Sequence, residues 1–269
     1  ILTCANGDVL LDGLSSTAGG TITYEWIDAN GTVTTGPELT VVTPGEVTLN
    51  ITDLNNGCTS TDVFLVEQDV DTPVALTSAG GTLLCGQADL ALDGSASSQN
   101  GNFTYEWWTF ENGAPLVMVE PTEITYNVTV PGDYVIIVLN TDNGCSTISA
   151  PVTVGQDISV PTPSMTPSDL VLTCDIQTIT FDASASTASA GSLIYVWTDI
   201  NGDTLSNTES IDVSSTDEVT LVITDDTNGC SASQIYSTTQ DVEEPSANAG
   251  PIQTLFCGIT EVTLDGSNS

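Results

Sequence analysis

Residues 47–58 read VTLNITDLNNGC, and this stretch decides the fold. Apolar Val47, Leu49 and Ile51 alternate with polar residues, which predicts a β-strand buried on one face. Residues 219–230 read VTLVITDDTNGC and repeat the pattern, with the same Asn-Gly-Cys turn at their end. Residues 134–145 read YVIIVLNTDNGC, where a nearly continuous apolar run predicts a strand covered on both faces. The chain is therefore predicted to be an all-β protein built from repeated units.

Seven cysteines mark those units. Four of them precede an apolar-Asp-small triplet at spacings of 81, 89 and 83 residues, and three close a complete unit inside Asn-Gly-Cys. Gln-Asp followed by a nearby proline recurs between units and indicates stiff junctions. The predicted domains are 1–69, which lacks its first strand, then 70–157, 158–241 and a partial fourth repeat at 242–269.

An aromatic pair follows the first cysteine of every unit, as Tyr24 and Trp26, Tyr105 and Trp107, and Tyr195 and Trp197. Side chains two apart on a strand share a face, so each pair is predicted to lie in the core, as in immunoglobulin-like sandwiches. Sugar stacking is the alternative role for such aromatics. Trp108 occurs once and faces opposite to its neighbour, which makes it the best candidate for a ligand or partner contact.

The simplest pairing of the cysteines is one disulfide per unit. It joins Cys4 to Cys58, Cys85 to Cys145 and Cys174 to Cys230, and leaves Cys257 with a partner outside the chain. Closing a loop of about 55 residues stabilises a fold by roughly 4 kcal/mol in the chain-entropy model. Disulfides imply an oxidising, extracellular setting. Reduced core cysteines, metal thiolates and pairing between repeats remain as alternatives.

Not one Lys, Arg or His occurs among the 269 residues, whereas Asp and Glu number 36, which gives a formal charge of −36. Binding to nucleic acid or to an anionic membrane surface needs basic side chains, so neither partner is expected. No apolar run reaches the length of a membrane span. Without His or Lys, most nucleophilic and phosphoryl-transfer chemistry is excluded, and no local pattern indicates a glycosidase pair of carboxylates. The chain is therefore predicted not to be an enzyme and to require no cofactor.

Acidic residues crowd the predicted junctions. Oxygen ligands at a junction suit Ca²⁺, which would hold neighbouring domains in line, although no EF-hand loop is present. A solvated acidic surface that keeps the chain extended and soluble is the alternative. The candidate calcium ligands are Glu67, Asp69 and Asp71 at the first junction, Asp157 at the second, and Asp241, Glu243 and Glu244 at the third.

The order of Leu-Asp-Gly, Tyr-x-Trp, a Pro-Gly turn, an alternating strand ending in Thr-Asp, and Asn-Gly-Cys resembles the polycystic-kidney-disease (PKD) type of immunoglobulin-like domain. Such domains carry Trp-x-Phe-Gly-Asp-Gly, whereas residues 26–31 here read WIDANG, so the resemblance is to a PKD-like relative. Tandem Cys-bearing versions with few basic residues resemble repeats of giant cell-surface adhesins of gliding Bacteroidota, which the type IX route secretes. That resemblance implies O-glycosylation at Asp-Thr-apolar triplets, and Thr204 fits one.

Together these features predict an elongated, extracellular array of disulfide-bonded immunoglobulin-like sandwiches at the cell surface. The expected function is a structural stalk or filament segment of a large adhesin of the gliding-motility type. Its expected partners are neighbouring repeats of the same chain, other filament subunits and surface polysaccharide. A polysaccharide-binding array and spacer domains of a secreted hydrolase are the alternatives.

Overall fold

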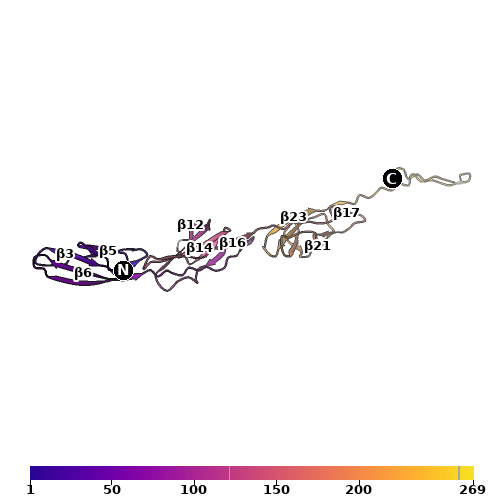
Figure 1. Cartoon of the computed structure of the whole chain (residues 1–269). Coiled ribbons are helices and arrows are strands. Elements are labelled where there is room, and N and C mark those ends of the chain that lie inside the picture. The colour runs from indigo at the N-terminus through magenta and orange to yellow at the C-terminus, as the bar shows by residue number, and fades with distance from the viewer. Residues whose placement is uncertain (121, 260) are drawn as a thin grey trace. The chain divides into compact units, whose positions relative to one another are not determined.

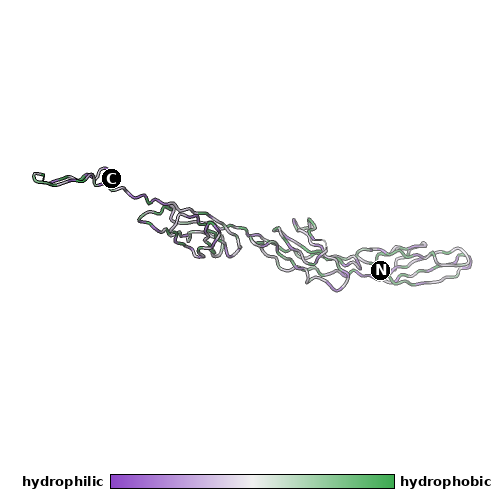
Figure 2. The backbone as a smooth tube through the Cα atoms, turned by 180° about the vertical axis from the view of Figure 1, so that it is seen from behind, coloured by the Kyte–Doolittle hydropathy of each residue, from purple (hydrophilic) through white to green (hydrophobic). Residues whose placement is uncertain are grey.

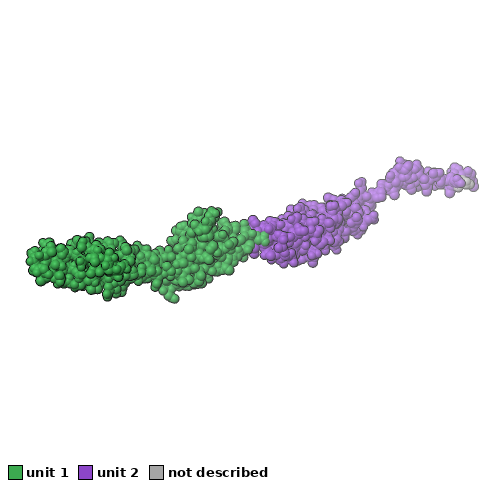
Figure 3. All heavy atoms as spheres, in the orientation of Figure 1, with its two compact units in different colours: residues 1–83, 87–157 green, residues 84–86, 158–269 purple. Residues whose placement is uncertain are grey.

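The computed structural model describes residues 1–120, 122–259 and 261–269, and these residues form β-strands and no helix. They divide into two compact units: residues 1–83 with 87–157, and residues 84–86 with 158–269 (Figure 3). None of the described segments is a helix long and apolar enough to cross a bilayer. Three separate apolar cores lie one in each of the three complete predicted repeats.

The first sandwich packs a four-stranded sheet, in the order β4-β3-β6-β7, against the antiparallel pair β2-β5 (Figure 1). Its core includes Leu11 from β2, Val41 from β5, and Trp26 and Val47 from the larger sheet. The strands are β1 (Leu2–Thr3), β2 (Val9–Asp12), β3 (Ile22–Ile27), β4 (Val33–Thr35), β5 (Glu38–Val41), β6 (Gly45–Asp53), β7 (Thr59–Val66) and β8 (Gln68–Asp69).

The second sandwich has a larger sheet in the order β12-β11-β14-β16-β9, with β15 also paired to β14, and a smaller pair β10-β13. Trp107 and Ile136 are fully buried between the two sheets. The strands are β9 (Thr82–Leu84), β10 (Leu90–Asp93), β11 (Phe103–Glu111), β12 (Ala114–Glu120), β13 (Thr125–Val128), β14 (Gly132–Asn140), β15 (Ser146–Ile148) and β16 (Val152–Asp157).

The third sandwich repeats the first, with a sheet in the order β20-β19-β22-β23 and the pair β18-β21. Its core surrounds Phe181 and Trp197, whose ring centroids lie 6.1 Å apart. The strands are β17 (Val171–Thr173), β18 (Ile179–Asp182), β19 (Leu193–Thr198), β20 (Thr204–Ser206), β21 (Ser210–Val213), β22 (Glu218–Asp225), β23 (Ser231–Ser237) and β24 (Thr239–Asp241). The expected all-β fold of tandem immunoglobulin-like sandwiches is confirmed.

The alternation of the sequence matches the pleat of the sheets, and Figure 2 shows apolar and polar residues interleaved along the backbone. In β6, Val47 and Leu49 point into the core, as predicted from their spacing. In β14, Val135 and Ile136 are both fully buried, so this strand is covered on both faces as its apolar run predicts. The positions of the repeat boundaries remain a prediction.

A short parallel pair closes the first and third sandwiches. The first strand of each lies beside the last strand, so Thr3 pairs with Asp69 and Thr173 pairs with Asp241. Parallel neighbours start at the same end of a sheet and finish together at the other. The residue that follows each first strand, Cys4 or Cys174, therefore lies at the end where the chain leaves its sandwich.

The core tryptophans differ in their polar contacts. The Trp26 indole N–H donates to the Gly36 carbonyl at 2.9 Å, and that of Trp197 donates to the Thr208 carbonyl at 3.0 Å. The Trp107 indole N–H is buried and has no hydrogen-bond acceptor among the described residues. The second sandwich therefore buries the same ring without the bond to the following loop.

This difference predicts unequal effects of the same substitution. Trp107→Phe and Trp197→Phe remove similar volumes from fully buried sites, but only the second deprives a carbonyl of its donor. We expect Trp197→Phe to lower the free energy of unfolding by about 1 kcal/mol more than Trp107→Phe. Amide hydrogen exchange of β14 and β22 measures the two sandwiches separately, and equal losses would contradict the assignment.

Candidate functional site

The disulfides join successive repeats instead of closing each repeat. Cys4 bonds Cys145 with a Cα–Cα distance of 5.0 Å, and Cys85 bonds Cys230 at 4.9 Å. The predicted pairs Cys4–Cys58, Cys85–Cys145 and Cys174–Cys230 are therefore wrong. Among the described residues, Cys58, Cys174 and Cys257 are exposed free thiols.

Strand direction explains why the predicted pairs do not form. Cys58 immediately precedes β7, and the chain then runs through β7 and β8 to Asp69, beside which β1 ends at Thr3. At about 3.3 Å per strand residue, the eleven steps from Cys58 to Asp69 cover roughly 35 Å. A disulfide needs Cα atoms within about 7 Å. Cys4 and Cys58 thus lie at opposite ends of one sandwich, and each can bond only to a neighbour.

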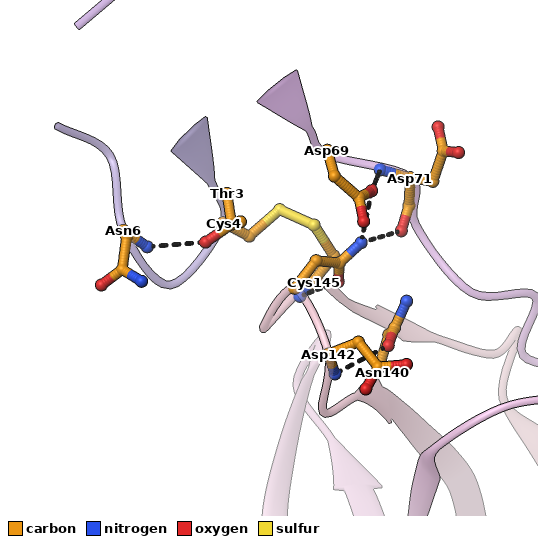
Figure 4. The surroundings of a disulfide bond; sticks show 9 residues. Thr3, Cys4, Asn6, Asp69, Asp71, Asn140, Asp142 and Cys145 are labelled. Carbon is orange, nitrogen blue, oxygen red and sulfur yellow. Dashed lines mark hydrogen bonds between the residues drawn. A yellow bond between two sulfur atoms is a disulfide. The ribbon is translucent and has the colours of Figure 1, made fainter. Parts of the chain in front are cut away.

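The first joint consists of the loop 3–6, the linker 69–71 and the turn 143–145 (Figure 4). Asn143 connects these parts because its side-chain amide donates to Asp69 Oδ1 at 2.9 Å and to the Asp71 carbonyl at 3.0 Å. Its Oδ1 accepts the Cys145 N–H at 2.9 Å, and its carbonyl accepts the Ala5 N–H at 3.1 Å. Asn143 and Cys145 are each 1% exposed. The disulfide therefore joins the exposed Cys4 to a buried turn that hydrogen bonds hold against the linker.

The second joint repeats this arrangement within the second unit. The Asn228 side-chain amide donates to the Ser159 carbonyl at 3.0 Å, and its Oδ1 accepts the Cys230 N–H at 2.8 Å. The Asn228 carbonyl accepts the Cys85 N–H at 3.0 Å. Asn228 and Cys230 are 2% and 1% exposed. A disulfide beside a hydrogen-bonded Asn-Gly-Cys turn thus occurs twice, with different surrounding residues.

Glycine is required in the turn of the first joint for two reasons. Gly144 has a φ of 73°, in the left-handed region that favours glycine. A Cβ atom on Gly144 would also lie 2.5 Å from the Ala5 Cβ. The sequence predicts a turn at each Asn-Gly-Cys triplet, but it does not predict that the Asn143 amide bonds Asp69 and Asp71 of the linker. The sequence feature that could have indicated this role is the recurrence of Asn-Gly-Cys in all three complete units.

The junction carboxylates do not gather into a metal site. Among the described residues there is no group of three or more His, Cys, Asp or Glu side chains that could hold a metal ion. Asp69 Oδ1 accepts the Asn143 amide and also the Asp71 N–H at 3.2 Å. Calcium binding by the seven acidic residues remains a prediction, and the described residues do not bring these side chains together as a cluster of ligands. Those residues are Glu67, Asp69, Asp71, Asp157, Asp241, Glu243 and Glu244.

Carboxylates elsewhere are held by backbone N–H groups. The Thr32 N–H donates to Asp28 Oδ1 at 2.8 Å, and this bond lowers the pKa of Asp28 below its ordinary value. Asp199 accepts the Asp203 N–H at 2.8 Å, which lowers its pKa in the same way. A general acid at neutral pH needs a raised carboxyl pKa. The shifted carboxyl pKa values of the described residues are all lowered, which favours anchoring of loops over acid catalysis.

Two other predicted sites lie away from the joints. Trp108 is half-buried in β11, and its indole N–H donates to Glu106 Oε2 at 3.0 Å. Thr204 is exposed at the start of β20. Ligand binding at Trp108 and glycosylation at Thr204 remain predictions.

The fold and the joints define a class: tandem immunoglobulin-like β-sandwich domains linked by disulfides. No family model matches the chain. It is 26% identical, over 299 aligned positions, to human dyslexia-associated protein KIAA0319, covering 100% of this chain and 28% of that protein. The mouse homolog is 27% identical, with coverage of 86% and 23%. The chain thus spans about a quarter of the length of these relatives.

Solved structures of tandem immunoglobulin domains are also similar. The four N-terminal domains of Dscam1 isoform 9.44 align with a TM-score of 0.27 and 12% identity, covering 81% of this chain and 64% of that one. The I67–I69 fragment of titin aligns with a TM-score of 0.34 and 13% identity, covering 87% of each chain.

The joint predicts different effects for two matched asparagines. Asn143→Ala removes the amide bonds to Asp69 and Asp71, whereas Asn56→Ala alters the same Asn-Gly-Cys turn, whose amide donates to Asp53 of its own sandwich. Both amides bond a carboxylate, but Asn143 is buried and also bonds the Asp71 carbonyl, so we expect Asn143→Ala to lower the free energy of unfolding by about 1 kcal/mol more. Urea denaturation of the oxidised chain measures both, and equal effects would show that the crossing bonds contribute nothing.

Proposed function

We propose that this chain is a structural segment of a large secreted protein, acting as a stalk or filament at the cell surface. The observation that carries the proposal is the covalent joint between successive repeats, made by Cys4–Cys145 and again by Cys85–Cys230. Disulfides are typical of proteins in oxidising, extracellular settings. The proposed role is non-catalytic. It includes a segment of a large cell-surface adhesin, the kind of protein whose repeats this sequence resembles.

The joint suits a stalk because it restricts movement where tandem domains ordinarily bend. Interfaces between domains of one chain are usually small and permit relative motion. Here the disulfide bonds the Cys4 loop to the Asn143 turn, and the Asn143 amide bonds both Asp69 and Asp71 of the linker. A repeat array with such nearest-neighbour contacts sets reach and stiffness by the number of its repeats.

Polysaccharide binding is the competing proposal, with Trp108 as its contact residue. The Trp108 indole N–H already donates to Glu106, and the side chain is half-buried. These features give a sugar-stacking role no specific support. The spacer role beside a secreted hydrolase shares the mechanical properties of a stalk and differs only in the domains of the parent protein.

Solution scattering tests the stalk proposal. Cys4→Ser/Cys145→Ser opens the first joint, whereas Cys58→Ser/Cys174→Ser removes the same number of sulfur atoms from free thiols and leaves both joints closed. We expect the first variant alone to sample a broader distribution of interatomic distances than the oxidised parent chain. Identical scattering from the two variants would contradict a stiffening role.

A glycan array separates the stalk from the binding module. The stalk proposal predicts no saturable binding by the parent chain. Binding that is saturable and lost in Trp108→Ala would establish the polysaccharide-binding alternative instead.

A further inference from the structure

The second sandwich has a longer edge strand than the first and third sandwiches. β12 is the outermost strand of its sheet and has seven residues, whereas β4 and β20, at the same place in the other sheets, have three each. Asn112 and Gly113 connect β11 to β12 with φ values of 52° and 83°, as the tight turn of a β-hairpin requires. Longer loops, at 28–32 and 199–203, connect the equivalent strands of the other sandwiches. The second sandwich therefore carries an extended β11–β12 hairpin.

The exposed side chains of β12 are apolar at consecutive positions. Leu116, Val117 and Met118 are 59%, 55% and 42% exposed. The outer edge of a strand also presents backbone N–H and C=O groups that can pair with another chain. Proteins ordinarily protect such an edge by keeping the strand short, as in β4 and β20, or by placing charges on it. A long apolar edge is an interaction site unless something covers it.

A pocket of about 580 Å³ adjoins this edge. Phe110 and Leu116 of the hairpin line it together with Tyr126 of β13 and Tyr134 of β14. The ring centroids of the two tyrosines lie 5.8 Å apart, and the Tyr134 hydroxyl donates to the Val130 carbonyl at 2.7 Å, which holds the turn before β14 in place as part of the lining. Edge strands of both sheets, β12 and β13, thus contribute to one pocket with aromatic walls.

The charged residues that line the pocket are both acidic. Glu111 at the end of β11 and Asp133 in β14 are exposed, and the Thr153 hydroxyl donates to Asp133 Oδ1 at 2.6 Å. The chain has no Lys, Arg or His that could neutralise either carboxylate. A ligand that brings an apolar group to the aromatic walls and a cationic group to these carboxylates complements both features of the pocket.

An extended peptide with basic side chains fits the edge and the pocket together. Pairing with β12 satisfies the backbone groups of the edge, and every second side chain of the added strand points to the same face, so alternate side chains can reach the pocket. A second copy of this chain fits less well. It carries a charge of −36 and has no basic side chain to bring to Glu111 and Asp133.

We propose that β12 and the adjoining pocket bind an extended, basic peptide segment of a partner protein by β-strand addition. A large apolar side chain of the segment enters the pocket beside Phe110 and Tyr126. A Lys or Arg about two residues away, on the same face of the added strand, pairs with Glu111 or Asp133. The inference goes beyond the stalk function, which needs no ligand, and each can be tested without the other.

An NMR titration of the oxidised full chain tests the proposal. The probe is a synthetic peptide of about nine residues in which Leu and Lys alternate on one face of the strand and Thr occupies the other face. At about 0.15 M salt, we expect saturable shifts of amide signals in residues 109–119 and 126–134, with a Kd below about 1 mM. Absence of saturable shifts, or shifts spread over the acidic loops of all sandwiches, would overturn the proposal.

A second peptide distinguishes strand addition from attraction to an acidic surface. It has the same side chains and charge, but every backbone nitrogen is methylated, so it cannot donate hydrogen bonds to the edge of β12. We expect its affinity to fall at least about tenfold, because strand addition depends on main-chain hydrogen bonds. Electrostatic attraction survives methylation, and equal affinity of the two peptides would therefore contradict the proposal.

Two exposed leucines on edge strands provide a matched pair of variants. Leu116 of β12 lines the pocket, whereas Leu205 of β20 is 48% exposed on the edge strand of the third sandwich. We expect Leu116→Ala to weaken binding of the parent peptide about tenfold, because the apolar contact in the pocket is lost, and Leu205→Ala to leave it unchanged. Equal effects of the two variants would show that the peptide does not use the pocket.

A second matched pair tests the acidic contribution. Glu111→Gln and Glu46→Gln each remove one negative charge from an exposed side chain, but only Glu111 lines the pocket. We expect Glu111→Gln alone to weaken binding, about threefold, as for an exposed ion pair. Equal affinities of the two variants would assign the attraction to net charge and overturn the proposed pairing. Shifts of β12 signals that depend on chain concentration without peptide would mean that a second copy covers the edge, which also contradicts the proposal.

Discussion

The structure depends on the parallel pairing of the first and last strands of a sandwich. β1 beside β8 and β17 beside β24 place one cysteine of the first and of the third repeat at the exit of its sandwich, while the Asn-Gly-Cys turn lies at the other end. A disulfide cannot span that length. The cysteines of one repeat are thereby made available to its neighbours, and pairing between repeats is the consequence.

The absence of basic side chains gives these joints added importance. With 36 acidic residues and no Lys, Arg or His, no side-chain ion pair can hold one repeat to the next. The chain uses uncharged donors in their place: the Asn143 amide bonds Asp69, and backbone N–H groups hold Asp28 and Asp199. Such bonds need no cation, and the disulfide keeps the donors and acceptors close despite like charge.

Much of the fold followed from periodicity, because alternation in residues 47–53 and 219–225 specifies which face of a strand is buried. The cysteine pairing did not follow, because periodicity says nothing about which strands are neighbours. The decisive strand β1 has only two residues, and Asn143 lies 74 residues from the Asp69 that it bonds. Contacts of that range depend on topology, and only the repetition of Asn-Gly-Cys pointed to them.

Peptide mapping of the oxidised chain without reduction tests the pairing between repeats most directly. Trypsin has no site in this sequence, so a Glu-specific protease or chymotrypsin must generate the fragments. The account predicts cross-linked peptides that contain Cys4 with Cys145 and Cys85 with Cys230. Peptides joining Cys4 to Cys58, or Cys85 to Cys145, would contradict it.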